Sequence, residues 1–497
     1  MARKIEQVFG PTPYMGFENQ YIGGVWRTGR SGAKTKDIDP YHDKMLVEIP
    51  LADQRDVDEA YRSAAKEQRA WAATLPRERA DVLRSVASIL EARHDEIVTW
   101  LIHESGSTRV KAEWEWQLVH AVTLEASSFP HRVNGRIIPV DEFGKESRVY
   151  RKPIGVIGVI SPWNFPMYLS HRSVAPALAL GNAVVLKPSE DTPITGGLLI
   201  AKIFQEAGLP RGILSVVVGT SRDIGDVITK HPVPRLISFT GSTAVGRNIA
   251  KLAAESPIIK RVALELGGNT PLVVLDDADL DQAVNAAVVS RYLHQGQICM
   301  STNRIIVDEK VSDEFEDKFT DRVSALKYGD PDDEDTVIGP LINSKQLERV
   351  KGHIQAARDQ GAREVLAGEP EGLVVPPHIF ADVTNDMQIA KTELFSPVAQ
   401  IIKVKGDDEA LRVANDTEYG LSSAVFSKDK ARGLRFALSL EAGMSHINDS
   451  SVDDRSNAPF GGEKNSGIGR FGGEWVMQEF TTDHWVTVQY APRTYPF

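Results

Sequence analysis

Short apolar runs alternate with amphipathic helical stretches along the chain from Gly155 onward. The apolar runs read "GVIGVIS", "AVVLKPS", "ILSVVVG", "RLISFTGS", "RVALELGG" and "PLVVLDD". Strands that alternate with helices are typical of a mostly parallel sheet with helices packed on it. The pattern therefore predicts an α/β fold, and it constrains the chain more than any other feature.

Two segments before this alternation have a different pattern. Residues 56–102 have the periodicity of two or three amphipathic helices, with a break at Thr74 and Pro76. Residues 135–153 contain two short extended runs around an acidic turn with Gly144, which predicts a β-hairpin.

The composition excludes several classes of protein. Of 497 residues, 42% are hydrophobic and 25% are charged, as in ordinary globular proteins, and the net charge of −11 argues against a nucleic-acid partner. The longest apolar runs are too short to cross a bilayer, and the first ten residues, "MARKIEQVFG", lack the apolar core of a secretory signal. A single cysteine forms no internal disulfide, which fits a reducing compartment. We therefore expect a soluble, cytoplasmic, multidomain protein with no membrane partner.

The only cysteine, Cys299, stands in the stretch "HQGQICMSTNR". A helical stripe of apolar residues precedes it, from Leu280 to about Leu293, and the following "NRIIVDE" is typical of a strand. A lone cysteine is more often a small buried hydrophobic residue than a reactive one. Here the polar neighbours and Gly296 predict a loop, in which backbone N–H groups can stabilise a thiolate. The context favours a reactive thiol.

Three other stretches carry candidate functional groups. In "SPWNFP", Asn164 is a candidate oxyanion donor, although a rigid loop with a packed Trp163 is the structural alternative. In "ALELGGN", Glu265 lies in an apolar strand, where a carboxylate is costly unless it is paired or functional. In "FTGSTAVG", a strand, a Gly-Ser turn and a helix start suit a phosphate, but the stretch does not match the G-x-G-x-x-G fingerprint.

Seven stretches follow one another in order between residues 161 and 470. They are "SPWNFP", "LKPSE", "FTGSTAVG", "LELGG", "GQICMSTNR", "ELFSPV" and "PFGGEKNSGIGR". Together they resemble the aldehyde dehydrogenase superfamily. The resemblance implies a Rossmann-like cofactor domain, an α/β catalytic domain and a small β element that bridges subunits.

The resemblance also implies roles for individual residues. Cys299 would attack an aldehyde to give a thiohemiacetal, and Asn164 with the backbone N–H of Cys299 would hold the oxyanion. After hydride transfer to NAD(P)⁺, Glu265 would activate the water that hydrolyses the thioester to a carboxylic acid. The residues implied in cofactor binding are Ser161, Pro162, Trp163, Lys187, Glu190, Gly241, Ser242, Glu393 and Phe395. Those implied in the substrate pocket are Met167, Tyr168, Val452 and Phe460, and no motif implies a metal.

Cofactor and substrate preferences follow from particular stretches. Glu190 favours NAD, because its carboxylate can bind a ribose diol and would repel a 2′-phosphate; NADP is the alternative. "ELGGN", "ELFSPV", "PFGGEKNSGIGRFGGEW" and "FTTDHWV" resemble the benzaldehyde and vanillin dehydrogenase branch, which implies an aromatic aldehyde. The alternatives are a broad-range aliphatic aldehyde dehydrogenase and a CoA-acylating semialdehyde dehydrogenase, although the latter class lacks the glutamate found at Glu265. A cysteine hydrolase using His294 would not need the phosphate turn.

The chain departs from the family pattern at three places. Asn269 replaces the usual lysine after "ELGG", and Ser396 replaces the glycine of the "FGPV" position. The loop "VDDRSNAP" before Phe460 is longer by a residue than in common members and lies near the expected substrate mouth. The substrates of common members are therefore a poor guide to those of this chain.

The resemblance further implies domain boundaries and an oligomer. The expected boundaries are residues 1–134, 154–265 and 466–479 for the NAD-binding domain, 266–465 for the catalytic domain, and 135–153 and 480–497 for the oligomerisation segments. The last two segments would form a bridging sheet, and exposed sheet edges invite pairing with another subunit. We expect a homodimer or a homotetramer.

Overall fold

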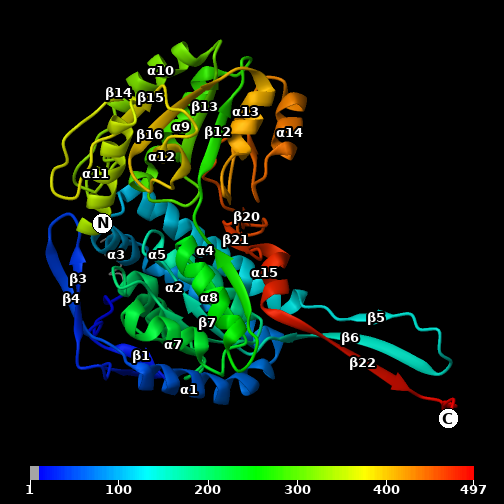
Figure 1. Ribbon diagram of the computed structural model, residues 1–497. Helices are drawn as coiled ribbons and strands as arrows, with labels where there is room; N and C mark the ends of the chain where they lie inside the picture. Colours follow the sequence, from blue (N-terminus) through cyan, green and yellow to red (C-terminus); the bar gives the residue numbers. More distant parts are fainter. Residues whose placement is uncertain (1–10) are drawn as a thin grey trace, which may run out of the picture.

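The protein consists of two α/β bodies and a projecting arm (Figure 1). The structure, a computed structural model, describes residues 11–497. Residues 1–10, in which no secretory signal is expected, lie outside the described residues. The first body holds an eight-stranded sheet, the second a seven-stranded sheet and the arm a three-stranded sheet. The α/β class predicted from the alternating pattern is confirmed.

The first sheet has a centre of five parallel strands. Its strands, in spatial order, are β2 (Val25–Arg27), β1 (Gln20–Ile22), β9 (Leu214–Val216), β8 (Ala183–Lys187), β7 (Val156–Ile160), β10 (Leu236–Thr240), β11 (Arg261–Glu265) and β21 (Gly467–Ile468). Strands β8, β9 and β10 are buried along their whole length. Parallel strands are typically covered on both faces, so these short apolar runs are continuous rather than alternating.

Helices and one further hairpin complete the first body. The helices are α1 (Gln54–Ala72), α2 (Pro76–Ala92), α3 (His94–Ser105), α4 (Arg109–Arg132), α5 (Pro166–Ala179), η1 (Ile194–Leu198), α6 (Leu199–Glu206), η2 (Ser221–Gly225), α7 (Asp226–Lys230) and α8 (Thr243–Glu255). The hairpin pairs β3 (Lys34–Asp39) with β4 (Lys44–Pro50). The predicted break at Thr74 and Pro76 separates α1 from α2, because proline suits the first turn of a helix.

The second sheet is built from the later part of the chain. Its strands, in spatial order, are β14 (Arg363–Leu366), β15 (His378–Ala381), β16 (Val398–Val404), β13 (Thr302–Asp308), β12 (Thr270–Val274), β18 (Ala424–Phe426) and β19 (His446–Ile447). The helices of this body are α9 (Leu280–Tyr292), η3 (Leu293–Gly296), α10 (Ser312–Ser324), α11 (Ser344–Asp359), α12 (Gln388–Lys391), α13 (Gly406–Asn415) and α14 (Lys430–Ser439). The predicted apolar stripe after Asp279 forms the buried face of α9.

The chain passes from the first sheet to the second between β11, which ends at Glu265, and β12, which begins at Thr270. It returns close to the C-terminus, where β21 pairs with β11 and α15 (Gly473–Glu479) follows. Just before this return, β20 (Glu463–Lys464) pairs with β17 (Tyr419–Gly420) of the second body.

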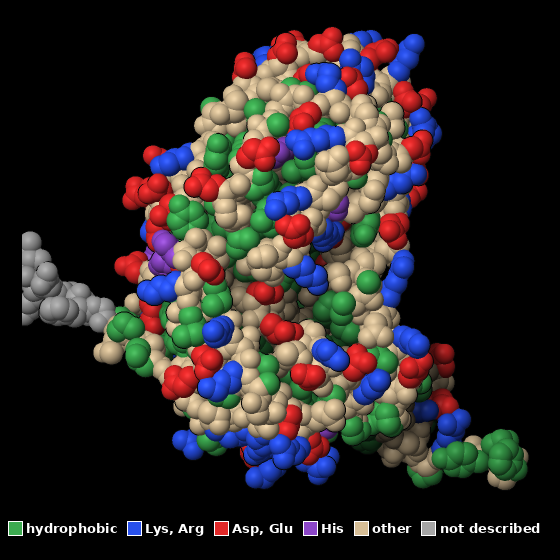
Figure 2. Space-filling view, turned by 60° about the vertical axis from the view of Figure 1, so that its left-hand side comes forward, with side chains coloured by type: hydrophobic (Ala, Val, Ile, Leu, Met, Phe, Trp, Pro, Cys, Tyr) green, Lys and Arg blue, Asp and Glu red, His purple; other side chains and the backbone are tan. Residues whose placement is uncertain are grey.

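The arm is an antiparallel sheet in the order β22-β6-β5. It consists of β5 (Arg136–Ile138), β6 (Lys145–Pro153) and β22 (Thr481–Gln489), so the predicted hairpin around Gly144 is confirmed. Hydrophobic side chains gather on it, whereas charged groups of both signs are interspersed over the bodies (Figure 2). The exposed hydrophobic residues there include Ile137, Phe143, Trp485, Tyr490 and Phe497. No helix within residues 11–497 is both long enough and apolar enough to cross a bilayer.

Candidate active site

The parallel strands of the first sheet end at one edge, where several predicted stretches meet. The register at this edge pairs Ile160 with Lys187, Ile160 with Phe239, and Thr240 with Glu265. Beyond the strands, the N–H of Ser161 donates to the carbonyl of Lys187 at 3.1 Å, and that of Gly241 donates to the carbonyl of Glu265 at 2.9 Å. Open α/β sheets bind their ligands outside this edge.

Cys299 approaches the edge from the second body, in the loop between η3 and β13. His294 and Gln295 in η3 have positive φ angles of 50° and 57°, which non-glycine residues rarely adopt. Buried contacts hold this conformation, since Gln295 Nε2 donates to the carbonyls of Gly106 at 3.1 Å and Pro340 at 2.7 Å. The cysteine loop is therefore anchored both to Gly106, which follows α3, and to Pro340, which precedes α11.

The thiol of Cys299 is partly buried and carries its proton at neutral pH. Burial raises its pKa to about 12; the carboxylates of Glu393 and Glu265 contribute to the rise, and the guanidinium of Arg172 opposes it. The backbone around the thiol is closely packed, because a Cβ added to Gly268 would lie 2.1 Å from the carbonyl oxygen of Cys299. Only glycine fits at that position.

Asn164 lies beside the cysteine loop, two residues before α5 begins. Its side chain is buried, and Nδ2 donates to the carbonyl of Gln297 at 2.9 Å. The start of α5 is itself fixed, because Glu115 Oε1 accepts two of its backbone N–H groups at 2.9 and 3.0 Å. An amide held in this way is suited to stabilise a developing oxyanion without reorganisation.

Glu265 ends β11 and is buried at the same edge, with 1% of its surface exposed. Neither carboxylate oxygen has a hydrogen-bond partner among the described residues. Burial raises the pKa of Glu265 to about 8, while the guanidinium groups of Arg172 and Arg470 lower it. A carboxyl group whose pKa lies near neutral pH is matched to general acid–base work.

Cys299 and Asn164 line one cleft of about 150 Å³ between the two bodies. Eight predicted residues line it: Pro162, Trp163, Asn164, Gly241, Ser242, Cys299, Glu393 and Phe395. Three lining residues lie outside every motif: Leu169, Gln346 and Arg349. Glu265 and the substrate residues do not line the cleft and lie deeper in the protein.

The far side of the cleft comes from the "ELFSPV" stretch. Phe395 has a positive φ of 51°, and its ring meets Trp163 edge to face at 5.6 Å between centroids. Glu393 Oε1 accepts the N–H of Gly268 at 2.9 Å, and Arg349 donates to the carbonyl of Glu393 at 2.7 Å. Burial raises the pKa of Glu393 to about 7. Phe395 and Glu393 thus line the cleft together with Trp163, which follows β7 at the sheet edge.

The turn between β10 and α8 fits a dinucleotide phosphate. Ser242 precedes α8, whose first N–H groups have no partner within the helix and suit an anion. A Cβ on Gly241 would lie 2.5 Å from the ring of Phe239, and a Cβ on Gly267 would lie 2.9 Å from Glu393. Packing against Phe239 and Glu393 therefore requires glycine at both positions, which line the cleft.

Lys187 ends β8 and Glu190 follows it at the same edge, but neither lines the cleft. Lys187 is buried and donates to the carbonyl of Pro188 at 3.2 Å, and burial lowers its pKa to about 8. Glu190 is half-buried, and its Oε1 accepts the N–H of Ser221 at 2.5 Å. Its second carboxylate oxygen has no protein donor among the described residues, which leaves it free for a ribose hydroxyl.

Comparison with known proteins assigns the chain to a family. Residues 26–486 match the Aldehyde dehydrogenase family. The chain belongs to this family. It is 52% identical to a vanillin dehydrogenase of Corynebacterium glutamicum over 94% of this chain and 97% of the relative. It is 48% identical to benzaldehyde dehydrogenase YfmT of Bacillus subtilis over 97% of this chain and 99% of the relative. Among solved structures, an NAD-dependent benzaldehyde dehydrogenase from Corynebacterium glutamicum superposes with a TM-score of 0.89 at 49% identity, over 97% and 98% of the two chains.

The residues expected in the substrate pocket of this aldehyde dehydrogenase belong to the hydrophobic cluster against which Cys299 packs. They are Met167, Tyr168, Val452 and Phe460, and all four are buried. The Tyr168 hydroxyl donates to Asp454 at 2.8 Å, and the Arg172 guanidinium lies 4.7 Å from the centroid of Phe460. Neither Arg172 nor Asp454 was predicted as a site residue. The signal for Arg172 was a charged residue within α5, and Asp454 lies in the loop "VDDRSNAP".

The departures from the family pattern are packed into the protein. Asn269 is buried, and its side chain donates to the carbonyl of Ala390 at 2.8 Å and accepts from Asn303 at 2.6 Å. Ser396 is buried in close contact with Gly296, where an added Cβ would lie 2.2 Å from the Ser396 carbonyl oxygen. Both residues therefore belong to the framework that holds the cysteine loop.

Proposed function

We propose that the protein oxidises aromatic aldehydes to carboxylic acids with NAD, through a thioester on Cys299. The observation that carries this proposal is the convergence of the thiol, the fixed Asn164 amide and the Gly241–Ser242 turn on one cleft, with the buried carboxyl of Glu265 at the same sheet edge. Bound NAD supplies the hydride acceptor.

Cys299 is the proposed nucleophile, and its proton has to leave as the S–C bond forms. The pKa values of Cys299 and Glu265 are about 12 and 8, so moving the proton to Glu265 costs about 5 kcal/mol. That cost is well within the barrier of about 16 kcal/mol that corresponds to about ten turnovers per second. A resident thiolate is therefore unnecessary, and the thiol stays protected until an aldehyde arrives.

Asn164 and the backbone N–H of Cys299 are the proposed donors to the oxyanion of the thiohemiacetal. Once the thioester has formed and Glu265 has released the Cys299 proton to solvent, Glu265 accepts a proton from the attacking water and returns it to the Cys299 sulfur as the acid leaves. Its buried position beside Arg172 keeps the carboxyl near neutral pKa, which is what such a base needs. The presence of Glu265 also disfavours a CoA-acylating enzyme, in which a thiol replaces water.

The cofactor is proposed to lie along the sheet edge. Gly241 and Ser242 would hold the pyrophosphate, Lys187 and Glu190 the adenosine ribose, and Glu393 with Phe395 the nicotinamide end. Ser161, Pro162 and Trp163 would line the path between them. NAD is preferred over NADP because the free oxygen of Glu190 would face a 2′-phosphate with like charge, and the named relatives include an NAD-dependent enzyme.

The aromatic substrate class rests on the relatives' names and on the walls near Cys299. The buried rings of Tyr168 and Phe460 suit a planar ring, and Arg172 Nε and Nη1, which have no hydrogen-bond partner among residues 11–497, suit an oxygen substituent. The test is NADH formation with benzaldehyde, 4-hydroxybenzaldehyde, vanillin and propanal under identical conditions. Higher kcat/KM for the aromatic aldehydes is expected; higher kcat/KM for propanal would make the enzyme a broad-range aliphatic dehydrogenase.

Three wider proposals accompany this activity. The exposed β5 edge and the apolar side chains of the arm support a homodimer or homotetramer, and light scattering that gives a monomer mass at micromolar concentration would refute it. The unpaired Cys299 supports a reducing, cytoplasmic location. The change of sheet after Glu265 supports residues 266–465 as the catalytic domain, with an NAD-binding domain before it.

A further inference from the structure

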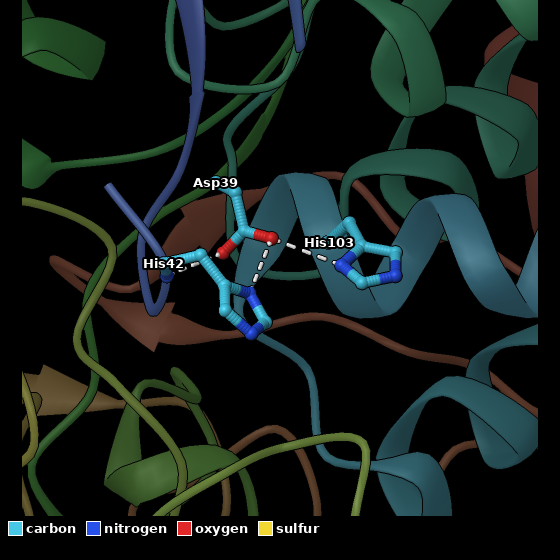
Figure 3. A group of neighbouring side chains, drawn as sticks. All are labelled: Asp39, His42 and His103. Atoms are coloured by element: carbon cyan, nitrogen blue, oxygen red, sulfur yellow. Dashed lines mark hydrogen bonds and ion pairs between the residues drawn. The ribbon is translucent and has the colours of Figure 1, made fainter. Parts of the chain in front are cut away.

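Two histidines and an aspartate converge far along the chain from any predicted site residue (Figure 3). Asp39 ends β3, His42 lies in the turn before β4, and His103 lies on α3. Nδ1 of His42 is 3.0 Å from Asp39 Oδ2, and Nδ1 of His103 is 2.9 Å from the same oxygen. One donor atom from each residue lies within 4.8 Å of the others.

The carboxylate at the centre of this group is fixed by the backbone. Asp39 is buried, and its other oxygen, Oδ1, accepts the N–H groups of Tyr41 at 2.9 Å and His42 at 3.0 Å. These contacts leave Oδ2 facing the two imidazole rings, as Figure 3 shows. The three donor atoms therefore already face one another.

A second carboxylate stands behind one ring. Nε2 of His103 is 3.6 Å from Asp332 Oδ2, and Asp332 Oδ1 is 3.6 Å from Arg109. Imidazoles that bind metals usually have a carboxylate or carbonyl at the nitrogen that does not bind, because it fixes the tautomer and the ring orientation. Asp332 is placed to do this for His103.

We propose that Asp39, His42 and His103 bind one divalent transition-metal ion such as Zn²⁺. Ligands of a tetrahedral zinc at about 2.0–2.1 Å are separated from one another by about 3.3–3.4 Å, so the two nitrogen–oxygen distances have to open by about 0.4 Å. The rings can do this, because the His42 and His103 side chains are 43% and 31% exposed. That exposure also gives water a fourth position.

The ligand types select the class of ion. Two imidazoles and one carboxylate suit Zn²⁺, Co²⁺, Ni²⁺ or Cu²⁺, whereas Mg²⁺ and Ca²⁺ prefer oxygen ligands. Binding replaces hydrogen bonds between the imidazoles and the carboxylate, and it releases any proton held on either Nδ1. None of the three residues lines the cleft around Cys299, so the ion would tie the β3–β4 turn to α3 and would take no part in aldehyde oxidation.

The test is titration of the full-length protein with Zn²⁺ and Co²⁺ in a Cys299→Ala background, which removes the thiol as a competing ligand. Equilibrium dialysis should give one ion per chain, and Co²⁺ should develop visible absorption of a four-coordinate site. Asp39→Asn, His42→Ala and His103→Ala should each abolish this binding, and Asp332→Asn should weaken it about 10–100-fold. His131→Ala, which removes an exposed histidine of α4, is the matched control and should bind as its parent does.

Binding of one ion should also raise the Tm of the parent and of the control, but not the Tm of the triad variants. Circular dichroism shows whether each variant is folded, and His103→Gln replaces His103→Ala if the latter is not. Absence of saturable binding to the parent overturns the proposal, as does unchanged binding by the triad variants. Because no turnover is measured, either outcome leaves the proposed dehydrogenase activity to its own assay.

Discussion

Replacing Glu265 by glutamine should separate hydride transfer from hydrolysis. Glutamine nearly preserves the size of the side chain, but its amide cannot accept a proton from water. Hydride transfer comes first, so rapid mixing of the variant with aldehyde and NAD⁺ should give a burst approaching one NADH per active site. Steady turnover should then be slower than wild type by about 10²–10⁴-fold. The acyl group should accumulate as added mass on the peptide that contains Cys299.

The raised pKa of Glu265 sets the pH dependence of the wild type. Only the ionised carboxylate accepts a proton, so with a pKa of about 8 the rate of hydrolysis should fall about tenfold for each pH unit below 8. It should level off above that pH. At pH 6 about one carboxyl in a hundred is ionised, which makes the thioester long-lived even in the wild type. The slow turnover of the glutamine variant should not show this fall in rate below pH 8.

The same shift gives the sign of a stability effect. Burial raises the pKa of Glu265 from 4.5 to about 8, so the unfolded state loses this proton at lower pH than the folded state. The wild type should therefore lose stability as pH rises from about 4.5 to about 8, by up to about 5 kcal/mol for this group. Glutamine does not ionise, so the Tm of the variant relative to wild type should be higher at pH 8.5 than at pH 5.

Two kinetic results would refute the role of Glu265. One is fast steady turnover by the glutamine variant. The other is the absence of any burst although NAD⁺ and aldehyde still bind, because the carboxylate would then be indispensable for hydride transfer and not chiefly for hydrolysis. A burst of full amplitude that is slower than in the wild type is the expected result, because Glu265 is also the proposed acceptor of the Cys299 thiol proton.

Other substitutions have distinct expected outcomes. Cys299→Ala should abolish both the burst and turnover while leaving NAD⁺ binding, measured by fluorescence titration, unchanged. Glu190→Gln should raise kcat/KM for NADP⁺ relative to NAD⁺, since it removes the negative charge expected to face a 2′-phosphate. Lys111→Met should lower stability by about 3–5 kcal/mol, because it leaves Glu115 buried without its cation, and adding Glu115→Gln should restore most of the loss in thermal denaturation. A burst or turnover in Cys299→Ala would contradict the first expectation. An unchanged ratio of kcat/KM for NADP⁺ and NAD⁺ in Glu190→Gln would contradict the second, and an unchanged Tm in Lys111→Met would contradict the third.

The parts of the structure that the sequence predicted depend on local chemistry. Pro76 separates α1 from α2, and Gly144 turns the hairpin of the arm with a positive φ of 68°. The sequence indicated Cys299, Asn164 and Glu265 as site residues because each places a reactive or polar side chain in a stretch whose structural role alone does not require it. The order of the motifs then identified the family, which periodicity alone could not do.

The parts that the sequence did not predict depend on contacts between distant segments. Lys111 and Glu115 are both fully buried on α4, and Glu115 fixes the start of α5 beside Asn164. Nothing in the spacing of α4 indicates this, since a lysine and a glutamate four residues apart are usually an exposed helix pair. Arg172 likewise carries no motif, although its charge lowers the pKa of both Cys299 and Glu265.

The same limit explains why no metal was expected from the sequence. Metal motifs are recognised when the ligands lie a few residues apart, whereas here one histidine comes from a turn and the other from α3, some sixty residues along the chain. Their common feature is Asp39, whose backbone contacts turn one oxygen toward both rings. A buried carboxylate with one oxygen satisfied by the backbone and the other facing two imidazoles is a ligand set that only the folded chain brings together. The affinity of this ligand set for an ion depends on how far the β3–β4 turn can open. The dialysis experiment measures this affinity directly.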